Sequence, residues 1–189
     1  MESGWPARAA TARRVRYEFL RRAAQACETP FVLTAHTQDD QAETVLMRLL
    51  RGSGATGLRG IHPQVALAEG YLLLRPLLTV TRAGVLSHCA QYGLAYRTDS
   101  TNLSVDFTRN RIRHEVLPLL RTFNPRVSEV LARTAELLAV EEAYLETAAQ
   151  RALATCLASE RQLSVPALLA QPLALQRRIL RAWGQVAGV

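Results

Sequence analysis

The sequence contains no lysine, because all 23 of its basic residues are arginine. This absence excludes several chemistries. An enzyme that works through a lysine Schiff base or a covalent lysyl-adenylate cannot rely on this chain's own residues. A Walker-type phosphate loop is excluded as well, because that loop needs its lysine.

Cysteines and long apolar runs are also scarce. Cys27, Cys89 and Cys156 lie far apart and form no CxxC pair, which argues against a cysteine-rich zinc or iron–sulfur site. No run of about 18 apolar residues predicts a membrane span. The first residues have an early acid, Glu2, and no apolar stretch like that of a signal peptide. We therefore expect a cytoplasmic protein.

The formal net charge is +7, and two explanations of it stay open. A GC-rich genome prefers arginine codons, which alone would enrich arginine. Alternatively, the chain binds a polyanion, since the arginine guanidinium pairs with phosphate through two hydrogen bonds and stacks on nucleic acid bases.

Apolar periodicity predicts an α/β part over residues 1–108 and an all-helical part over 109–189. In the first part we expect short buried strands, the first of them parallel. The predicted strands are 31–35, 71–75 and, less regular, 94–97, and the predicted helices are 7–28, 38–51 and 82–92. In the second part, breaks between helices are expected near 124–125, 164–166 and 172.

The predicted sheet is incomplete. Two or three strands are fewer than a twisted parallel sheet usually has, and no strand precedes the first helix. We therefore expect the opening strands of the sheet to be absent. The exposed edges of such a sheet invite pairing, which leaves a homodimer open.

A cluster of acids follows the first predicted strand. Asp39, Asp40 and Glu43 are spaced to gather on one side of the first helical turns, next to His36. Ligands bind at the carboxyl ends of strands in such sheets, and carboxylate oxygens suit Mg²⁺. The alternative is helix capping, because Thr37 and Asp40 match a loose capping box and acids offset the helix dipole.

Two further stretches are candidates for binding phosphate. The glycine-rich stretch Arg51, Gly52, Ser53, Gly54 follows the helix and would let backbone amides approach a phosphate, although a helix end and a flexible loop explain it equally well. Arg109 and Arg113 share a helix face, and at a helix start they oppose the dipole. We expect Asp99, Asp106 or a bound phosphate to offset them; a solvated basic face paired with nearby acids is the alternative.

Five blocks, in this order and at this spacing, resemble tRNA(Ile)-lysidine synthetases, which are N-type ATP pyrophosphatases, or PP-loop enzymes. The blocks are Thr34-Ala35-His36-x-x-Asp39-Asp40-Gln41-x-Glu43-Thr44, Arg51-Gly52-Ser53-Gly54-x-x-Gly57-Leu58, Arg75-Pro76-Leu77-Leu78, Asp99-x-x-Asn102 and Arg109-Asn110-x-x-Arg113. The resemblance implies a partial parallel sheet of the adenine-nucleotide alpha hydrolase type, followed by a helical tRNA-binding domain.

The resemblance also implies a reaction. Such enzymes adenylate the wobble cytidine of tRNA(Ile) with a CAU anticodon, using ATP and Mg²⁺, and free lysine then displaces AMP. Catalytic roles would fall on Asp39, Asp40, Glu43, Arg109 and Arg113, of which the three acids would help hold Mg²⁺, ATP or the lysine ammonium group. Substrate or tRNA contacts would fall on His36, Arg51, Gly52, Ser53, Gly54, Asp99, Asn102 and Asn110.

One departure from the family pattern bears on activity. The family's phosphate-cradling string, Ser-Gly-Gly-x-Asp-Ser, does not occur in this sequence. We therefore expect weak or absent ATP turnover from this chain alone. Two alternatives remain: a catalytically silent tRNA-binding module, and a related PP-loop tRNA thiolase, against which the absence of CxxC argues.

Overall fold

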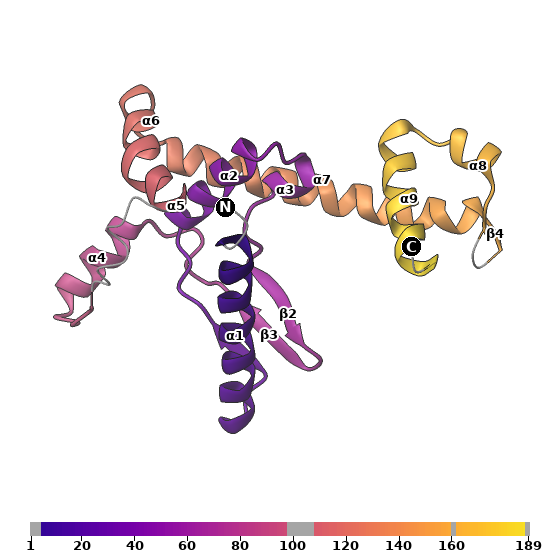
Figure 1. Ribbon diagram of the computed structural model, residues 1–189. Helices are drawn as coiled ribbons and strands as arrows, with labels where there is room; N and C mark the ends of the chain where they lie inside the picture. Colours follow the sequence, from indigo (N-terminus) through magenta and orange to yellow (C-terminus); the bar gives the residue numbers. More distant parts are fainter. Residues whose placement is uncertain (1–4, 98–107, 160–161, 188–189) are drawn as a thin grey trace.

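The computed structural model describes residues 5–97, 108–159 and 162–187. Figure 1 shows three extensions that meet around α2 (Gln38–Leu50). One holds the first helix and the sheet, one is the short helix α4 (Arg82–Gln91), and the third is the long helix α7 (Val127–Cys156). Among the described residues, none of the helices is long and apolar enough to cross a membrane.

The sheet has three strands in the order β1-β3-β2. β1 (Phe31–Leu33) runs parallel to β3 (Tyr71–Leu74), as predicted, and β2 (Gln64–Ala68) pairs with β3 in the antiparallel sense. The first helix, α1 (Trp5–Ala26), contacts β1 and β2. A small core of Ala24, Val32 and Leu73 joins the helix to the sheet.

Two predictions about strands are wrong. β1 is not a buried strand, because only Val32 is buried while Phe31 and Leu33 are exposed at the edge of the sheet. Residues 94–97 form no strand and continue irregularly after α4. The short apolar run there has no neighbouring strand with which to exchange backbone hydrogen bonds, and local preference alone does not make a strand.

The start of α2 follows its sequence closely. Thr37 caps the helix, and the side chain of Asp40 returns a hydrogen bond to the backbone of Thr37, which completes the predicted capping box. Gly52 ends the helix with a φ of 75°, a conformation that favours glycine. The predicted cap of α4 by Thr81 is also confirmed.

α2 joins the two parts of the chain. Its buried residues Ala42 and Leu46 pack against Ile112 and Leu117, and its flank lies along α7. These partners belong to a run of short helices before α7: α5 (Thr108–Arg111), the π-helix η2 (Ile112–Val116) and α6 (Leu117–Phe123). The division of the chain at residue 108 stays a prediction.

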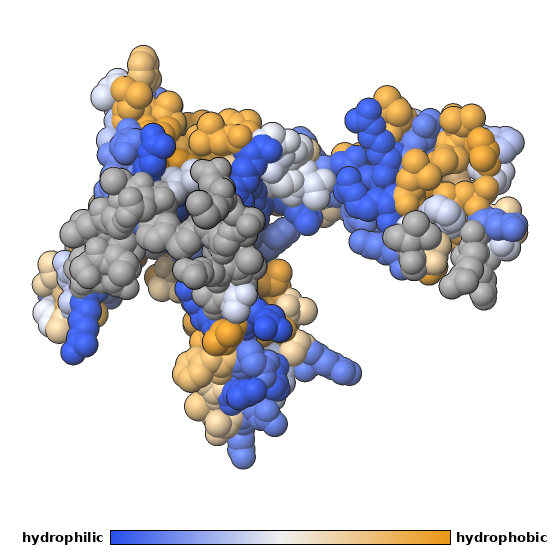
Figure 2. All heavy atoms as spheres, in the orientation of Figure 1, coloured by the Kyte–Doolittle hydropathy of each residue, from blue (hydrophilic) through white to orange (hydrophobic). Residues whose placement is uncertain are grey.

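The far end of α7 carries a separate small core. Ala149 and Cys156 of α7 pack with Leu168 of α8 (Val165–Leu169) and Ile179 of α9 (Leu173–Ala187). Figure 2 shows hydrophobic side chains gathered on this end of the molecule. Three further short elements complete the described chain, namely α3 (Ala55–Leu58), β4 (Leu157–Ser159) and β5 (Gln162–Leu163).

A buried ion pair connects this end to the rest of the chain. Glu142 on α7 is 4% exposed; it accepts a hydrogen bond of 2.6 Å from Thr56 of α3 and pairs with Arg178 of α9. Burial by itself raises the pKa of the Glu142 carboxyl, but the hydrogen bond from Thr56 and the charge of Arg178 outweigh it, so the pKa is lowered.

We predict that Glu142→Ala lowers the free energy of unfolding by about 3–5 kcal/mol, because it leaves the charge of Arg178, whose side chain is 14% exposed, buried without a partner. Urea unfolding followed by circular dichroism measures this change. The matched control is Glu141→Ala, an exposed neighbour whose loss should change the value by no more than about 0.5 kcal/mol. Equal effects of the two variants would contradict the structural role of the buried pair.

Candidate active site

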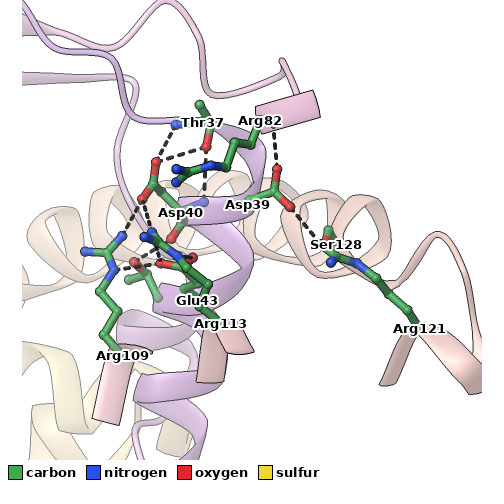
Figure 3. A network of polar contacts seen from close by, with 10 residues as sticks. Thr37, Asp39, Asp40, Glu43, Arg82, Arg109, Arg113, Arg121 and Ser128 are labelled. Carbon is green, nitrogen blue, oxygen red and sulfur yellow. Dashed lines mark hydrogen bonds and ion pairs between the residues drawn. The ribbon is translucent and has the colours of Figure 1, made fainter. Parts of the chain in front are cut away.

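The site is built around the first turns of α2, where two carboxylates meet two arginines. Glu43, whose side chain is 1% exposed, accepts hydrogen bonds from Arg109 Nε at 2.7 Å and from Arg113 Nε at 2.5 Å. The Oδ1 atom of Asp40 accepts from Arg109 Nη2 at 2.7 Å and from Arg113 Nη2 at 3.4 Å. Figure 3 shows both arginines pointing toward the same side of α2.

These four residues, Asp40, Glu43, Arg109 and Arg113, are called the ion-pair cluster below. Both arginines come from segments 66 to 73 residues further along the chain. The π-helix η2 contains Arg113, and wide helical turns of this kind occur often at functional sites. The cluster therefore fastens the start of the helical part to the strand-to-helix turn of the α/β part.

The cluster keeps its charges. Burial by itself raises the pKa of the Asp40 carboxyl, but hydrogen bonds from Thr37 and the charges of Arg109 and Arg113 outweigh it, and the pKa falls below its ordinary value. The hydrogen bond to Glu43 raises the pKa of Arg113. Asp40 and Arg113 are therefore ionised at neutral pH.

The ion-pair cluster shows which described groups balance the charges of Arg109 and Arg113. Among the described residues, the partners are Asp40 and Glu43, which matches the alternative of a basic face paired with nearby acids, and the expected roles of Asp99, Asp106 or a bound phosphate stay predictions. Asp99, Asp106 and Asn102 lie outside the described residues. Two of the predicted acids and the predicted arginine pair therefore lie together in the fold and form one group of ion pairs.

Asp39 stands apart from the ion-pair cluster. Its Oδ2 atom accepts a hydrogen bond of 2.7 Å from the backbone N–H of Arg82, and its Oδ1 atom accepts one of 2.9 Å from Arg121. Arg121 also donates to Ser128 at 3.2 Å (Figure 3). Asp39 thus ties α2 to the start of α4 and to α6.

The three carboxylates do not fit a magnesium site in this arrangement. Every carboxylate oxygen of Asp39, Asp40 and Glu43 accepts from a backbone or side-chain donor. Within the described ranges, no three acidic, histidine or cysteine side chains gather as metal ligands would. Magnesium binding by these acids stays a prediction.

Arg109 faces a cavity of about 350 Å³ at the carboxyl ends of β1 and β3, here called the strand-end pocket. His36 follows β1 into this pocket, and its Nδ1 atom lies 3.0 Å from the hydroxyl of Thr34. Arg48, Arg75 and His62 line it as well, and the lining residues that the structure describes include no carboxylate. The pocket is therefore suited to an anionic group.

Arg75 gives the clearest sign of a ligand in this pocket. Its residue is 6% exposed, and its Nε atom is buried with no hydrogen-bond partner, although Nη1 donates to the carbonyl of His62 at 2.5 Å. Burial, together with the charges of Arg59, Arg48 and Arg75, lowers the pKa of His62, which keeps that ring neutral. A buried guanidinium donor left open fits an incoming oxyanion.

The structure does not bring every predicted residue to this place. Arg51, Gly52, Ser53 and Gly54 lie at the opposite end of α2, which at 1.5 Å per residue is roughly 18 Å away. Asn110 is buried on α5 beside the cluster. Substrate contacts at these five residues stay predictions.

Four residues of the site were missed in the sequence: Arg48, His62, Arg75 and Arg121. Arg75 stood inside a block of the family resemblance and followed a predicted strand, which was a usable signal. Arg48 and Arg121 look like ordinary exposed positions on helices, so their role depends on the fold.

The comparisons with known proteins identify the class. A family model described as the PP-loop domain matches residues 7–120, more than half of the chain, so the chain belongs to the PP-loop family. The predicted fold class is thereby confirmed. A U34-tRNA thiolase from Methanococcus maripaludis shares the fold, with a TM-score of 0.53 and 20% identity over 69% of this chain and 44% of its own.

The predicted resemblance within this class is confirmed too. The tRNA(Ile)-lysidine synthase of Symbiobacterium thermophilum is 46% identical over 90% of this chain and 37% of its own length. That of Thermosynechococcus vestitus is 42% identical over 94% of this chain and 52% of its own. The chain spans between a third and slightly over half of the length of such curated relatives.

We predict that Asp40→Asn lowers the free energy of unfolding at pH 7 by about 1–2 kcal/mol, because charge-assisted hydrogen bonds to Thr37 and two partly exposed arginines are weakened. The folded pKa of Asp40 is lowered, so its contribution is present above the unfolded pKa of about 3.9 and disappears as the pH falls through the folded pKa.

Urea unfolding of both proteins between pH 7 and pH 2 measures this difference. Glu115→Gln, which removes a surface pair with Arg111, serves as control and should change stability by less than about 1 kcal/mol. A gap between wild type and Asp40→Asn that stays constant down to pH 2 would refute the assignment of the shift to Asp40.

Proposed function

We propose that this chain forms part of a tRNA(Ile)-lysidine synthetase in the cytoplasm. The observation that carries the proposal is the extent of the similarity: relatives of that name match about nine tenths of the chain at 37–46% identity. The reaction would join lysine to the wobble cytidine of a tRNA(Ile) with a CAU anticodon, at the expense of ATP.

The geometry supports a role in charge stabilisation. Adenylation of a base releases pyrophosphate, and the later attack of lysine expels AMP, so negative charge develops on phosphate oxygens in both steps. Arg109 is 38% exposed and borders the strand-end pocket, whereas Arg113 is 20% exposed and lies on the other side of Glu43. Guanidinium groups held rigidly in this way stabilise such charge without reorganising.

The roles of the two acids follow from the same contacts. Asp40 and Glu43 hold the guanidinium groups in place, so we assign them as positioning residues for Arg109 and Arg113. Arg75, with its open Nε donor, and His36 are placed to receive an anionic part of the substrate in the strand-end pocket. ATP is the cofactor that the family implies, and lysine is the second substrate.

A tRNA thiolase of the same fold is less well supported. The three cysteines lie on separate elements, with Cys27 after α1, Cys89 in α4 and Cys156 at the end of α7. The match to the thiolase structure, at 20% identity, concerns the fold alone.

A chimera tests the proposal. This chain would replace the matching segment of the Symbiobacterium thermophilum relative, which supplies the rest of that enzyme. We predict that the chimera forms lysidine from a CAU tRNA, ATP and lysine, measured by mass spectrometry of the nucleosides. A folded chimera that binds the tRNA yet makes no lysidine, next to an active parent, would contradict the proposed activity.

In the chimera, we predict that Arg113→Ala lowers kcat for lysidine formation by at least about 10²-fold, because a donor aimed at developing charge is lost. Arg113→Lys should recover part of the rate, since it restores charge but not the fork geometry. Arg133→Ala, an exposed residue of α7, is the matched control and should stay within a few-fold of wild type. A similar kcat for Arg113→Ala and Arg133→Ala would remove Arg113 from the catalytic machinery.

A further inference from the structure

A second cavity lies on the other side of the ion-pair cluster from the strand-end pocket. It has a volume of about 540 Å³ and is formed where α4, α6 and the start of α7 approach α2, and we name it the helix-start cleft. Four arginines line it, contributed by four different segments of the chain: Arg82, Arg113, Arg121 and Arg126.

The acids of this cleft are already occupied. Glu43 is held by both Arg113 and Arg109. Asp39 is held by Arg121 and by the backbone N–H of Arg82. Glu129 lies 4.0 Å from Arg126, and both of these side chains are exposed. The described lining holds four arginines and three acids, so the cleft keeps an excess of positive charge.

The guanidinium groups of two of the arginines can pair with an anionic ligand. The side chain of Arg126 is 79% exposed, and within the described part of the chain its only charged contact is the long one with Glu129. Arg82 begins α4, and Asp39 binds its backbone N–H, which leaves the guanidinium for another group. Arg121 is already oriented across the cleft by Asp39 and Ser128 (Figure 3). Asp39 therefore orients Arg121 and the start of α4, and the lining of the cleft still carries more arginines than acids.

The rest of the lining indicates what kind of anion fits. Neutral polar groups come from Gln38, Thr81 and Ser128, and the apolar groups are the small or aliphatic Ala83, Leu86, Leu117 and Pro125. Among the residues that the structure describes, the lining has no aromatic side chain on which a base would stack. A cleft of arginines and hydroxyls without a stacking platform is suited to a sugar–phosphate backbone, which such groups contact without reading bases.

We propose that the helix-start cleft binds the phosphodiester backbone of an RNA, through Arg82, Arg121 and Arg126. The inference rests on the proposed function, because that function makes a tRNA the substrate. Arg113 lines this cleft and shares Glu43 with Arg109, which lines the strand-end pocket. A strand of RNA bound in the cleft would therefore pass directly beside the place where its reacting nucleotide is held.

Binding of the 189-residue chain to a fluorescently labelled tRNA transcript with a CAU anticodon tests this proposal. The double variant Arg82→Gln/Arg126→Gln alters two exposed side chains, and its thermal unfolding should match wild type. We predict a dissociation constant at least about tenfold higher, and a log–log salt dependence that is shallower by roughly 2, because each phosphate contact contributes close to one.

The matched control is Arg133→Gln/Arg177→Gln, which removes the same charge from exposed positions on α7 and α9 outside the cleft. It should bind the transcript within about twofold of wild type. Because the contacts are to the backbone, a tRNA with a different anticodon should lose affinity for the cleft variant to the same extent.

Equal losses in the cleft variant and the control would overturn the proposal, as would a wild-type chain that binds no tRNA. A loss of ATP binding with unchanged tRNA affinity would assign the cleft to a free nucleotide and would also overturn it. The chimera experiment tests the proposed ligase activity separately, because its failure would be seen as an absence of lysidine. That outcome would not change the result of the tRNA-binding measurement.

Discussion

The structure depends on the carboxylate of Glu43, which is almost completely buried and pairs with two arginines. An isolated carboxylate in such a place would lose its proton only at great cost, so its burial requires cations. Arg109 and Arg113 supply them from segments far along the chain. The same contacts therefore hold the two parts of the molecule together and keep two guanidinium groups beside the strand ends.

This interaction also explains the placing of the two cavities. The strand-end pocket lies on the side of Arg109 and the helix-start cleft on the side of Arg113, with Glu43 between them. One cavity has a buried guanidinium donor without a partner, and the other has exposed arginines arranged by Asp39. The strand-end pocket would suit the reacting anionic group, and the helix-start cleft would suit the backbone of the RNA that carries this group. Under the two proposals above, a single buried acid, Glu43, would link the chemistry to the binding of the RNA.

Most local features of the fold were predictable from the sequence, whereas among long-range features the parallel sense of β1 was predictable and its exposure was not. The capping box of Thr37 and Asp40 and the start of α4 at Thr81 were readable because the groups involved lie within a few residues of each other. The strand β2 was missed because Glu69-Gly70 is a weak turn signal compared with Asn-Gly or Asp-Gly. The exposure of β1 depends on which strands lie beside it, which its own residues do not encode.

Prediction of the site from the sequence was limited in the same way, because its contacts join residues far apart in the chain. The sequence identified both the acids and the arginines, and family resemblance grouped them, but helix periodicity carries no information on which acid meets which arginine across some 70 residues. The assignment of Asp39 with Asp40 and Glu43 rested on their spacing, whereas the fold turns Asp39 toward Arg82 and Arg121. Magnesium, lysine and the polar loop before α5 remain predictions for the same reason, since no local pattern decides them.

A double-mutant cycle between Glu43→Gln and Arg113→Gln, read as the free energy of unfolding in urea, tests the central claim most directly. If the buried carboxylate holds the two parts of the chain through Arg113, the two changes are coupled by about 1–3 kcal/mol, because the second removes a partner that the first has already lost. Additive effects, within about 0.5 kcal/mol, would contradict the account.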